Sequence, residues 1–411
     1  MKILHLFNRH RGGGGADNAW DATIALSRRR GLDVATFERD SRMLPQGLRG
    51  KFSAFANGLY GADAVRALAA RLQEDRPDIV HSHELYPLIT PWVLEICARA
   101  GVPVVHSCYD FRITCPVATH FDGTSVCTHC SDKGAHHAVL RDCRGNRMES
   151  AAFALRHAVA SRRDFYRRHV AQFIVLTDFS RRWLIEHAGI APERITVNEC
   201  SVPAAPVPVD PAKGSYFAYA GRLVPEKGIA TLIDAARMSG LPMRIAVPEG
   251  SDTSLVKDPA VSVTPTSGPE MLAEFYRGAR ALVVPSLWFE TFSIVAAEAM
   301  GHGVPVIAAR IGALRDTVRE NQTGLHFTPG NAAELAALMA RLWNDSALCR
   351  GLGAAAYAEA QARFGEDVHF QRLLDAYRRG LAIEASSVPT QSLQRRKATV
   401  DSWSETRPFD C

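Results

Sequence analysis

The segment Ala281-Leu-Val-Val-Pro-Ser-Leu-Trp-Phe-Glu290-Thr-Phe-Ser-Ile-Val-Ala-Ala-Glu298 joins a short apolar run to a longer apolar stretch across a polar turn. A short apolar run that ends at a proline is typical of a buried strand, here Ala281–Pro285. The longer stretch predicts a helix over Phe292–His302. Glu290 would then lie at the junction between loop and helix, and Glu298 about two turns further on.

This strand–turn–helix unit recurs on both sides of the segment, and short apolar strands that alternate with helices predict a parallel sheet covered on both faces. The chain therefore belongs to the α/β class, with two doubly wound units in series. The strands expected in the first unit are Ile3–Phe7, Val34–Phe37, Ile79–His83, Val102–His106, Phe173–Leu176 and Ile195–Val197. Those expected in the second are Tyr216–Ala220, Met243–Val247, Ala281–Pro285, Val304–Ala308 and Gly324–Phe327.

A proline-rich stretch separates the two units. Its prolines break both helix and sheet, so we expect a linker over residues 200–214. The domains expected around it are a first Rossmann-like domain over 1–199 and a second over 215–365. A last helix over 366–383 and a polar, disordered tail over 384–411 follow.

The charge and hydropathy of the chain exclude several classes of function. A net charge of +5 over 411 residues is too small to indicate nucleic-acid binding. No apolar stretch reaches the ~18 residues of a membrane span, and the apolar start at Met1–Phe7 is too short for a signal peptide. We expect a cytoplasmic protein. Arginine clusters indicate either solvated helix faces or a peripheral contact with anionic lipid or with a diphosphate-bearing acceptor; they include Arg162, Arg163, Arg167 and Arg168.

Two loops in the second unit carry groups suited to a diphosphate. Arg222 and Lys227 lie five residues apart in the turn after the strand Tyr216–Ala220, so both cations can reach one anion. The second loop carries Glu290, and the helix start after it would direct backbone amides at the same anion. The residues expected to supply those amides are Thr291, Phe292, Ser293 and Ile294.

A glycine-rich turn follows the first strand. Gly12, Gly13, Gly14 and Gly15 would let the backbone approach a phosphate at the start of a helix. The spacing departs from the G-x-G-x-x-G pattern. Because Glu38 and Asp40 lie near the end of the next strand, a dinucleotide-binding enzyme is also compatible with this turn, as is a turn without a ligand.

Together these motifs resemble the GT-B glycosyltransferases of family 4, and most closely the bacterial subgroup that builds exopolysaccharide or lipopolysaccharide. The resemblance rests on Gly221-Arg222-Leu223, Lys227-Gly228 and the two glutamates eight residues apart, Glu290 and Glu298, and it extends from about Met1 to Leu381. It implies two Rossmann-like domains facing across a cleft, with the last helix crossing back to the first domain. It also implies a retaining reaction with a nucleotide sugar and no metal requirement for catalysis.

The resemblance assigns roles residue by residue. Arg222 and Lys227 would hold the donor diphosphate, Glu290 would approach the donor sugar, and Glu298 would hold the ribose. Gly12–Gly15 would line the cleft.

This sequence departs from the family pattern at three places. Tyr109-Asp110 stands where the family commonly has His followed by Asp or Asn, and Thr291 stands where it often has Gly. The turn after Met243–Val247 contains Pro248 in place of the expected glycine-rich sequence. The candidate catalytic residues are therefore Glu290, Tyr109 and Asp110.

Four of the nine cysteines lie within an insertion expected over 111–147. Cys115, Cys127, Cys130 and Cys143 include one C-x2-C pair, and four thiolates suit a tetrahedral structural zinc site. Reduced cysteines without a metal are the alternative.

The function expected from all of these features is transfer of a hexose-type sugar from a UDP- or GDP-sugar to a saccharide or polyprenyl-linked saccharide acceptor, in cell-surface polysaccharide synthesis. The alternatives are a sugar-nucleotide epimerase, an NAD-dependent Rossmann enzyme, and a non-catalytic, zinc-containing binding protein.

Overall fold

Two six-stranded sheets organise the chain, as the alternation of strands and helices predicts. The computed structural model describes residues 1–10, 14–45 and 47–387. Within it, one unit contains Met1–Ser107, Arg163–Phe173 and the chain from Leu374 onward, and the other contains Cys108–Arg162 and Ile174–Leu373. Gly12, Gly13 and residues 388–411 of the expected tail lie outside the described residues.

The first sheet has the strand order β2-β1-β3-β4-β5-β6, and its pairs β1–β2, β1–β3 and β3–β4 are parallel. Its strands are β1 (Lys2–Arg9), β2 (Asp33–Asp40), β3 (Ile79–Ser82), β4 (Val104–Cys108), β5 (Gln172–Val175) and β6 (Ile195–Val197). The central strands β3, β4 and β5 are buried along their whole length, which explains their continuous apolar runs. The helices of this part of the chain are α1 (Gly15–Arg29), α2 (Gly47–Leu59), α3 (Ala62–Asp75), α4 (Trp92–Arg99), α8 (Phe165–His169) and α9 (Asp178–Ala188).

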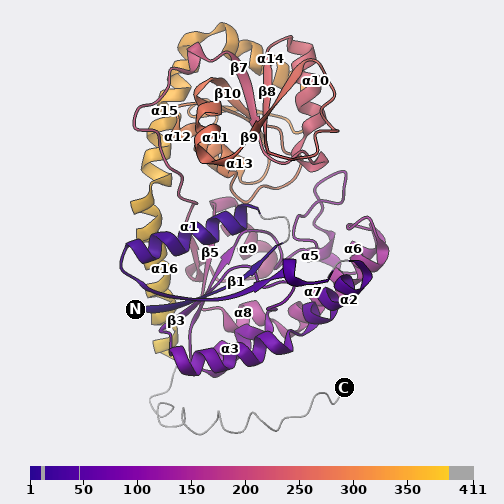
Figure 1. Cartoon of the computed structure of the whole chain (residues 1–411), viewed down its shortest axis with the longest axis vertical. Helices are drawn as coiled ribbons and strands as arrows, with labels where there is room; N and C mark the ends of the chain where they lie inside the picture. The colour runs from indigo at the N-terminus through magenta and orange to yellow at the C-terminus, as the bar shows by residue number, and fades with distance from the viewer. Residues whose placement is uncertain (11–13, 46, 388–411) are drawn as a thin grey trace. The chain divides into compact units, whose positions relative to one another are not determined.

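The second sheet has the order β12-β11-β10-β7-β8-β9, with every neighbouring pair parallel. Its strands are β7 (Tyr216–Ala220), β8 (Met243–Pro248), β9 (Val261–Thr266), β10 (Ala279–Val284), β11 (Val306–Ala309) and β12 (Gly324–Phe327). Its helices include α10 and α14, which lie beside the sheet in Figure 1. They are α10 (Ile229–Ser239), α11 (Gly268–Arg277), α12 (Ile294–Gly301), α13 (Leu314–Thr317), α14 (Ala332–Asn344) and α15 (Ser346–Phe364), followed by α16 (Glu366–Ser387).

Each sheet has a point where the strand order reverses. From β1 the chain passes to β2 on one side and later to β3 on the other. From β7 it passes to β8 and β9 on one side, whereas β10, β11 and β12 lie on the other. Loops diverge at such a point, so the carboxyl edge between the two strands is where open α/β sheets bind ligands. The glycine-rich turn follows β1, and the loops of Arg222 and Glu290 follow β7 and β10.

The insertion contains two short helices, α5 (His129–Lys133) and α6 (His137–Leu140), and leads into α7 (Arg147–Arg163). An isolated antiparallel bridge between Phe121 and Val126 closes a hairpin ahead of the C-x2-C pair.

The proline-rich segment 200–214 contains one 3-10 turn, at Pro211–Lys213, and otherwise no helix or strand. Its backbone bonds to the second unit: the amide of Val202 donates to Phe364 and the amide of Ala205 donates to Gly301. Val202 is buried. The segment is therefore packed along the second unit over these residues.

Several strand bounds, among them those of β4, β5, β10 and β11, differ from the expected ones by one or two residues, and three further differences concern whole elements or helix ends. The edge strand β9 was not expected; Pro265 lies within it, and an edge strand accommodates a proline because one of its sides has no partner. Helix α12 begins at Ile294 instead of near Phe292, and α16 continues past residue 383 to Ser387. Of the helices that the structure describes, none combines the length and apolarity needed to cross a membrane.

Candidate active site

The loops after β7 and β10 meet at the carboxyl edge of the second sheet. The amide of Leu287 donates to the carbonyl of Glu226 at 2.9 Å. Gly228 has φ +75°, and a Cβ there would lie 1.9 Å from the carbonyl oxygen of Pro285. Only glycine permits this approach. The loop that carries Lys227 and the loop that carries Glu290 are distant in the sequence but lie against each other in the structure.

Lys227 and Glu290 form an ion pair at the centre of this surface. The Nζ of Lys227 lies 2.6 Å from Oε1 of Glu290, and the same oxygen accepts from Ser286 Oγ at 2.7 Å and Trp288 Nε1 at 3.1 Å. The ammonium also lies 5.4 Å from the centre of the Trp288 ring. These contacts fix the carboxylate with one oxygen fully engaged.

The pKa of Glu290 reflects two opposing effects. Burial alone would raise it, but the charge and hydrogen bond of Lys227, together with Ser286 and Trp288, outweigh burial and hold the pKa below its ordinary value. Glu290 is 8% exposed. It is therefore an ionised carboxylate within a largely desolvated loop.

Arg222 lies on the same loop as Lys227 but is exposed. Tyr219 Oη donates to its carbonyl at 2.8 Å, which fixes the backbone and leaves the guanidinium in solvent. Among the described residues, no carboxylate lies within the 4.0 Å of an ion pair with it. An unpaired, exposed guanidinium is suited to a bidentate contact with a phosphate.

The helix after Glu290 starts later than the sequence suggests. Ser293 adopts the left-handed conformation with φ 79°, and α12 begins at Ile294. Thr291, Phe292 and Ser293 therefore form a turn before the helix, which corrects the expectation that their amides belong to its first turn. The first intrahelical bond is donated by Ala296, so the amides of Ile294 and Val295 precede the hydrogen-bonded ladder.

Phe292 and Glu298 occupy different environments from Glu290. Phe292 is 2% exposed and packs edge-on against Phe364 with 5.3 Å between ring centres, so its side chain belongs to the core. Glu298 accepts a hydrogen bond from Tyr276 Oη at 2.9 Å. Burial raises the pKa of Glu298, and the Tyr276 bond offsets part of that rise. This carboxylate is therefore partnered, as a half-buried helix glutamate requires.

The structure brings Tyr109 to the Glu290 loop. Thr291 Oγ1 donates to the carbonyl of Tyr109 at 3.0 Å. Asp110 faces its own neighbour: its carboxylate accepts from the guanidinium of Arg112 at 2.6 Å and from the amide of Arg112 at 2.9 Å. The carboxylate of Asp110 is therefore bound to Arg112 of its own loop, whereas Tyr109 contacts Thr291, the residue that follows Glu290.

The glycine-rich turn belongs to the other unit, and only part of it is described. Gly14 precedes α1 with φ +150°, a conformation that side-chain-bearing residues rarely adopt, and Gly15 is the first residue of that helix. These two glycines lie at the start of α1, at the reversal point between β1 and β3.

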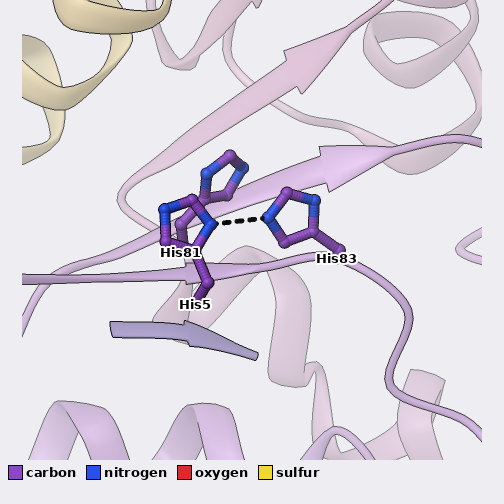
Figure 2. Close-up of side chains that lie close together, drawn as sticks. All are labelled: His5, His81 and His83. Carbon is purple, nitrogen blue, oxygen red and sulfur yellow. Dashed lines mark hydrogen bonds between the residues drawn. The ribbon is translucent and has the colours of Figure 1, made fainter. Parts of the chain in front are cut away.

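Three buried histidines in this unit were not singled out from the sequence (Figure 2). The nitrogens of His5, His81 and His83 lie within 4.8 Å of one another, and His5 Nδ1 lies 3.1 Å from His83 Nε2. However, His81 Nδ1 lies 2.9 Å from Tyr377 Oη and its Nε2 lies 2.8 Å from Ser107 Oγ. The His81 and His83 rings also stack at 3.9 Å with a 31° tilt, so their in-plane lone pairs do not converge. We interpret the group as a hydrogen-bonded core network.

This network predicts a specific sensitivity to acid. Burial, aided by Arg28, lowers the pKa of His5 to about 3. The unfolded chain, with an ordinary pKa near 6.5, therefore binds the proton first, and stability is lost as the pH falls from 6.5 toward 3. We expect protonation linked to His5 alone to lower the free energy of unfolding by about 2–3 kcal/mol between pH 7.5 and pH 4.5. Urea unfolding at both pH values measures it.

The matched variants are His5→Leu and, as a control, His136→Leu, since His136 is exposed. The loss on acidification should shrink in the first and persist in the second. Equal pH dependence in all three proteins would contradict the assignment.

The other three thiols of the cysteine insertion lie close enough to Cys130 to affect its pKa. Burial first, and then the charges of Cys115, Cys143 and Cys127, raise the pKa of Cys130 to about 12. Cys127 Sγ lies 3.2 Å from His129 Nδ1. Among the described residues, however, the four sulfurs do not meet the spacing within 4.8 Å that the three histidines meet.

Two protein-family models match the sequence. One, described as Glycosyltransferase Family 4, matches residues 13–205, and the other, described as Glycosyl transferases group 1, matches residues 214–345. A D-inositol 3-phosphate glycosyltransferase of Acidothermus cellulolyticus is 33% identical over 247 residues, which are 52% of this chain and 54% of that protein. The chain thus spans about half the length of this relative.

Solved structures share the fold. A sucrose-phosphate synthase from Thermosynechococcus elongatus superimposes with a TM-score of 0.68 at 19% identity, covering 93% of this chain and all of that one. HepE of Anabaena, in complex with UDP and glucose, gives a TM-score of 0.63 at 19% identity, covering 94% of this chain and all of that one.

Proposed function

Because the chain belongs to the glycosyltransferases of the GT-B fold, we propose that it moves a hexose-type sugar from a UDP- or GDP-sugar to a saccharide acceptor, with retention of configuration. The observation that carries this proposal is the Lys227–Glu290 pair beside exposed Arg222 at the strand-order reversal of the second sheet. Cations, an ionised carboxylate and a helix start meet there within one unit.

In this proposal each residue of the site binds a different part of the donor. Arg222 and Lys227 bind the diphosphate and neutralise the charge that develops on it as the glycosidic bond breaks. The amides of Ile294 and Val295 add donors to the same anion. Glu290 faces the sugar, and Glu298 binds the ribose. Tyr109 and Asp110 remain candidates for contact with the reacting sugar, and Gly12–Gly15 remain candidates for binding the donor.

The donor base and the acceptor are finer points of the proposal. HepE is described in complex with UDP, which favours a uracil donor. A saccharide or polyprenyl-linked saccharide of the cell surface is the proposed acceptor, acted on in the cytoplasm. The name of the Acidothermus relative favours a second candidate, a phosphorylated inositol. Incubation with donor and each acceptor class, followed by mass spectrometry, separates them: product with inositol phosphate alone would refute the polysaccharide role.

A thermal-shift screen tests the donor proposal. UDP, GDP, ADP and NAD are each added to the purified protein, and a ligand at 100 times its dissociation constant should add about 2.7 kcal/mol to stability. We expect one nucleoside diphosphate to stabilise the protein, with no effect of NAD. Stabilisation by NAD alone would instead support the dehydrogenase alternative.

We propose further that Cys115, Cys127, Cys130 and Cys143 hold a structural zinc ion, while catalysis itself needs no metal. The four cysteines lie in one insertion, and thiolates are the ligands that structural zinc sites use. Closing a tetrahedral site requires the sulfurs to move closer together than the described spacing.

Metal analysis tests the zinc proposal without any activity assay. We expect about one zinc per chain, lost in the double variant Cys127→Ser/Cys130→Ser and retained in Cys97→Ser, whose buried cysteine lies in α4. Zinc-free protein after purification in zinc-supplemented buffer would overturn it.

A peripheral membrane contact is the last part of the proposal. Of the arginines expected to make it, Arg167 pairs with Asp164 at 2.9 Å and Arg163 lies over the Trp92 ring at 4.8 Å. Arg162 and Arg168 are exposed. Co-sedimentation with anionic vesicles tests this contact, and no binding by the unaltered chain would refute it.

A further inference from the structure

Two sets of contacts hold Glu290 in place. One set is made by its carboxylate, and the other is made by the residue before it in the chain. The residue before it, Phe289, lies against three other rings: Phe179 at 5.1 Å, Trp183 at 5.1 Å and Phe111 at 6.1 Å between centres. We call these four residues the aromatic cluster. Its members come from the start of the cysteine insertion, from α9 and from the Glu290 loop, all within the second unit.

The main chain beside Glu290 is equally constrained. A Cβ at Gly312 would lie 3.1 Å from Phe289 Cα and 3.3 Å from the Glu290 amide nitrogen, so the chain packs directly on that glycine. Ala313 donates its amide to the Glu290 carbonyl at 3.2 Å. The next residue, Thr291, donates to Tyr109 and accepts from Thr177 Oγ1 at 3.2 Å.

Trp183 joins this cluster to the polar interior of the insertion. An indole nitrogen can only donate, so Trp183 Nε1 donates to Thr114 Oγ1 at 3.0 Å. The Thr114 hydroxyl then lies 2.8 Å from His120 Nε2, and His120 Nδ1 lies 2.9 Å from the carbonyl of Cys127. One chain of hydrogen bonds thus runs from the C-x2-C pair to the ring that Phe289 packs against.

We propose that the cysteine insertion is the scaffold that positions Glu290, with Phe111 and Trp183 as positioning residues for sugar transfer. Neither reaches the carboxylate; both act through Phe289. The activity part of this inference rests on the proposed function. The structural part does not, because order in the loop is measurable without a substrate.

The physical reason is the steep dependence of transfer on geometry. A displacement of about 1 Å at a reacting group can reduce a rate by about 100-fold. Removing the Trp183 ring leaves Phe289 a void to relax into, whereas Lys227 and Arg222 stay anchored on the loop after β7. Nucleotide binding should therefore survive while turnover falls.

The test compares Trp183→Leu and Phe111→Leu with Trp343→Leu, a control on α14 whose ring packs on Phe217 at 6.0 Å, away from the Glu290 loop. Hydrogen–deuterium exchange of a peptide covering 286–293 is measured first. We expect exchange to be about tenfold faster in the two cluster variants than in the unaltered protein, and unchanged in the control variant. The conservative variant Trp183→Phe, which keeps a ring, should restore most of the protection.

Two further readouts separate positioning from general damage. At a temperature where all variants are folded, the rate of nucleoside diphosphate release from the donor sugar should fall about tenfold or more in Trp183→Leu, with affinity for the free nucleotide unchanged. Unchanged exchange over 286–293, or an equal rate loss in Trp343→Leu, would overturn the proposal. If the unaltered chain cleaves no donor, the proposed function fails, and the exchange data still decide the role of the insertion.

Discussion

Replacing Lys227 with alanine is expected to destabilise the second unit by about 3–5 kcal/mol, the usual cost of removing one partner of a buried ion pair. The cost is large because Glu290 is left in a desolvated loop with its charge unbalanced: the pair's side chains are 22% and 10% exposed. The pKa of Glu290 should rise accordingly, because burial then acts against fewer opposing contacts. Urea unfolding at pH 7.5 measures the loss.

The double variant Lys227→Met/Glu290→Gln provides the internal check. It removes both charges, so it should recover much of the stability lost in Lys227→Ala while remaining unable to cleave the donor. Lys257→Ala, at an exposed lysine of the same unit, should change stability by less than about 0.5 kcal/mol. A Lys227→Ala protein as stable as the Lys257→Ala protein would contradict the buried pair.

Replacing Arg222 with alanine should have the opposite profile, with little effect on stability and a large effect on donor binding. The guanidinium is exposed and has no ion-pair partner among the described residues, so the fold does not depend on it. The proposed contact of Arg222 with a diphosphate would be charge-assisted and would contribute about 1.5–3 kcal/mol, which corresponds to about 10- to 100-fold in affinity. Calorimetric titration with the stabilising nucleoside diphosphate measures it.

The control for Arg222→Ala is Arg341→Ala, at an exposed arginine in the last turn of α14. It removes the same charge from the same unit and should leave affinity within about twofold, because surface charges distant from a site are screened. If both variants weaken binding equally, the effect of Arg222 is one of net charge and the assignment of a specific contact is wrong.

The sequence predicts most strands because they are short apolar runs between turn residues, and the central ones are buried along their whole length. The strands Ile195–Val197, Tyr216–Ala220 and Gly324–Phe327 match the structure residue for residue, since each is a short apolar run between turn residues. The edge strand β9 could not be predicted in the same way. It is half exposed and contains Pro265, so it lacks the continuous apolar pattern.

The candidate site was predictable in its residues but not in its contacts. Arg222, Lys227 and Glu290 each follow the carboxyl end of a parallel strand, which indicates that they lie at the same edge of the sheet. Nothing in the spacing shows that Lys227 bonds Glu290, because that contact depends on the close approach of Gly228 to Pro285. The start of α12 was placed too early because the left-handed turn at Ser293 has no distinctive sequence signal.

The aromatic cluster and the histidine network were missed for a related reason. Phe111, Trp183 and Phe289 are distant in sequence, and each alone is indistinguishable from an ordinary core residue. His5 and His81 are direct partners in the β1–β3 register, so a correct strand alignment would have paired them before the structure did.

The central claim is that a nucleotide-sugar donor binds at the carboxyl edge between β7 and β10, and a structure of the protein with its stabilising nucleoside diphosphate tests it most directly. The account predicts the diphosphate in contact with Arg222, Lys227 and the amides of Ile294 and Val295, with the ribose at Glu298. A nucleotide bound elsewhere, with the Lys227–Glu290 pair untouched and Arg222 in solvent, would contradict it.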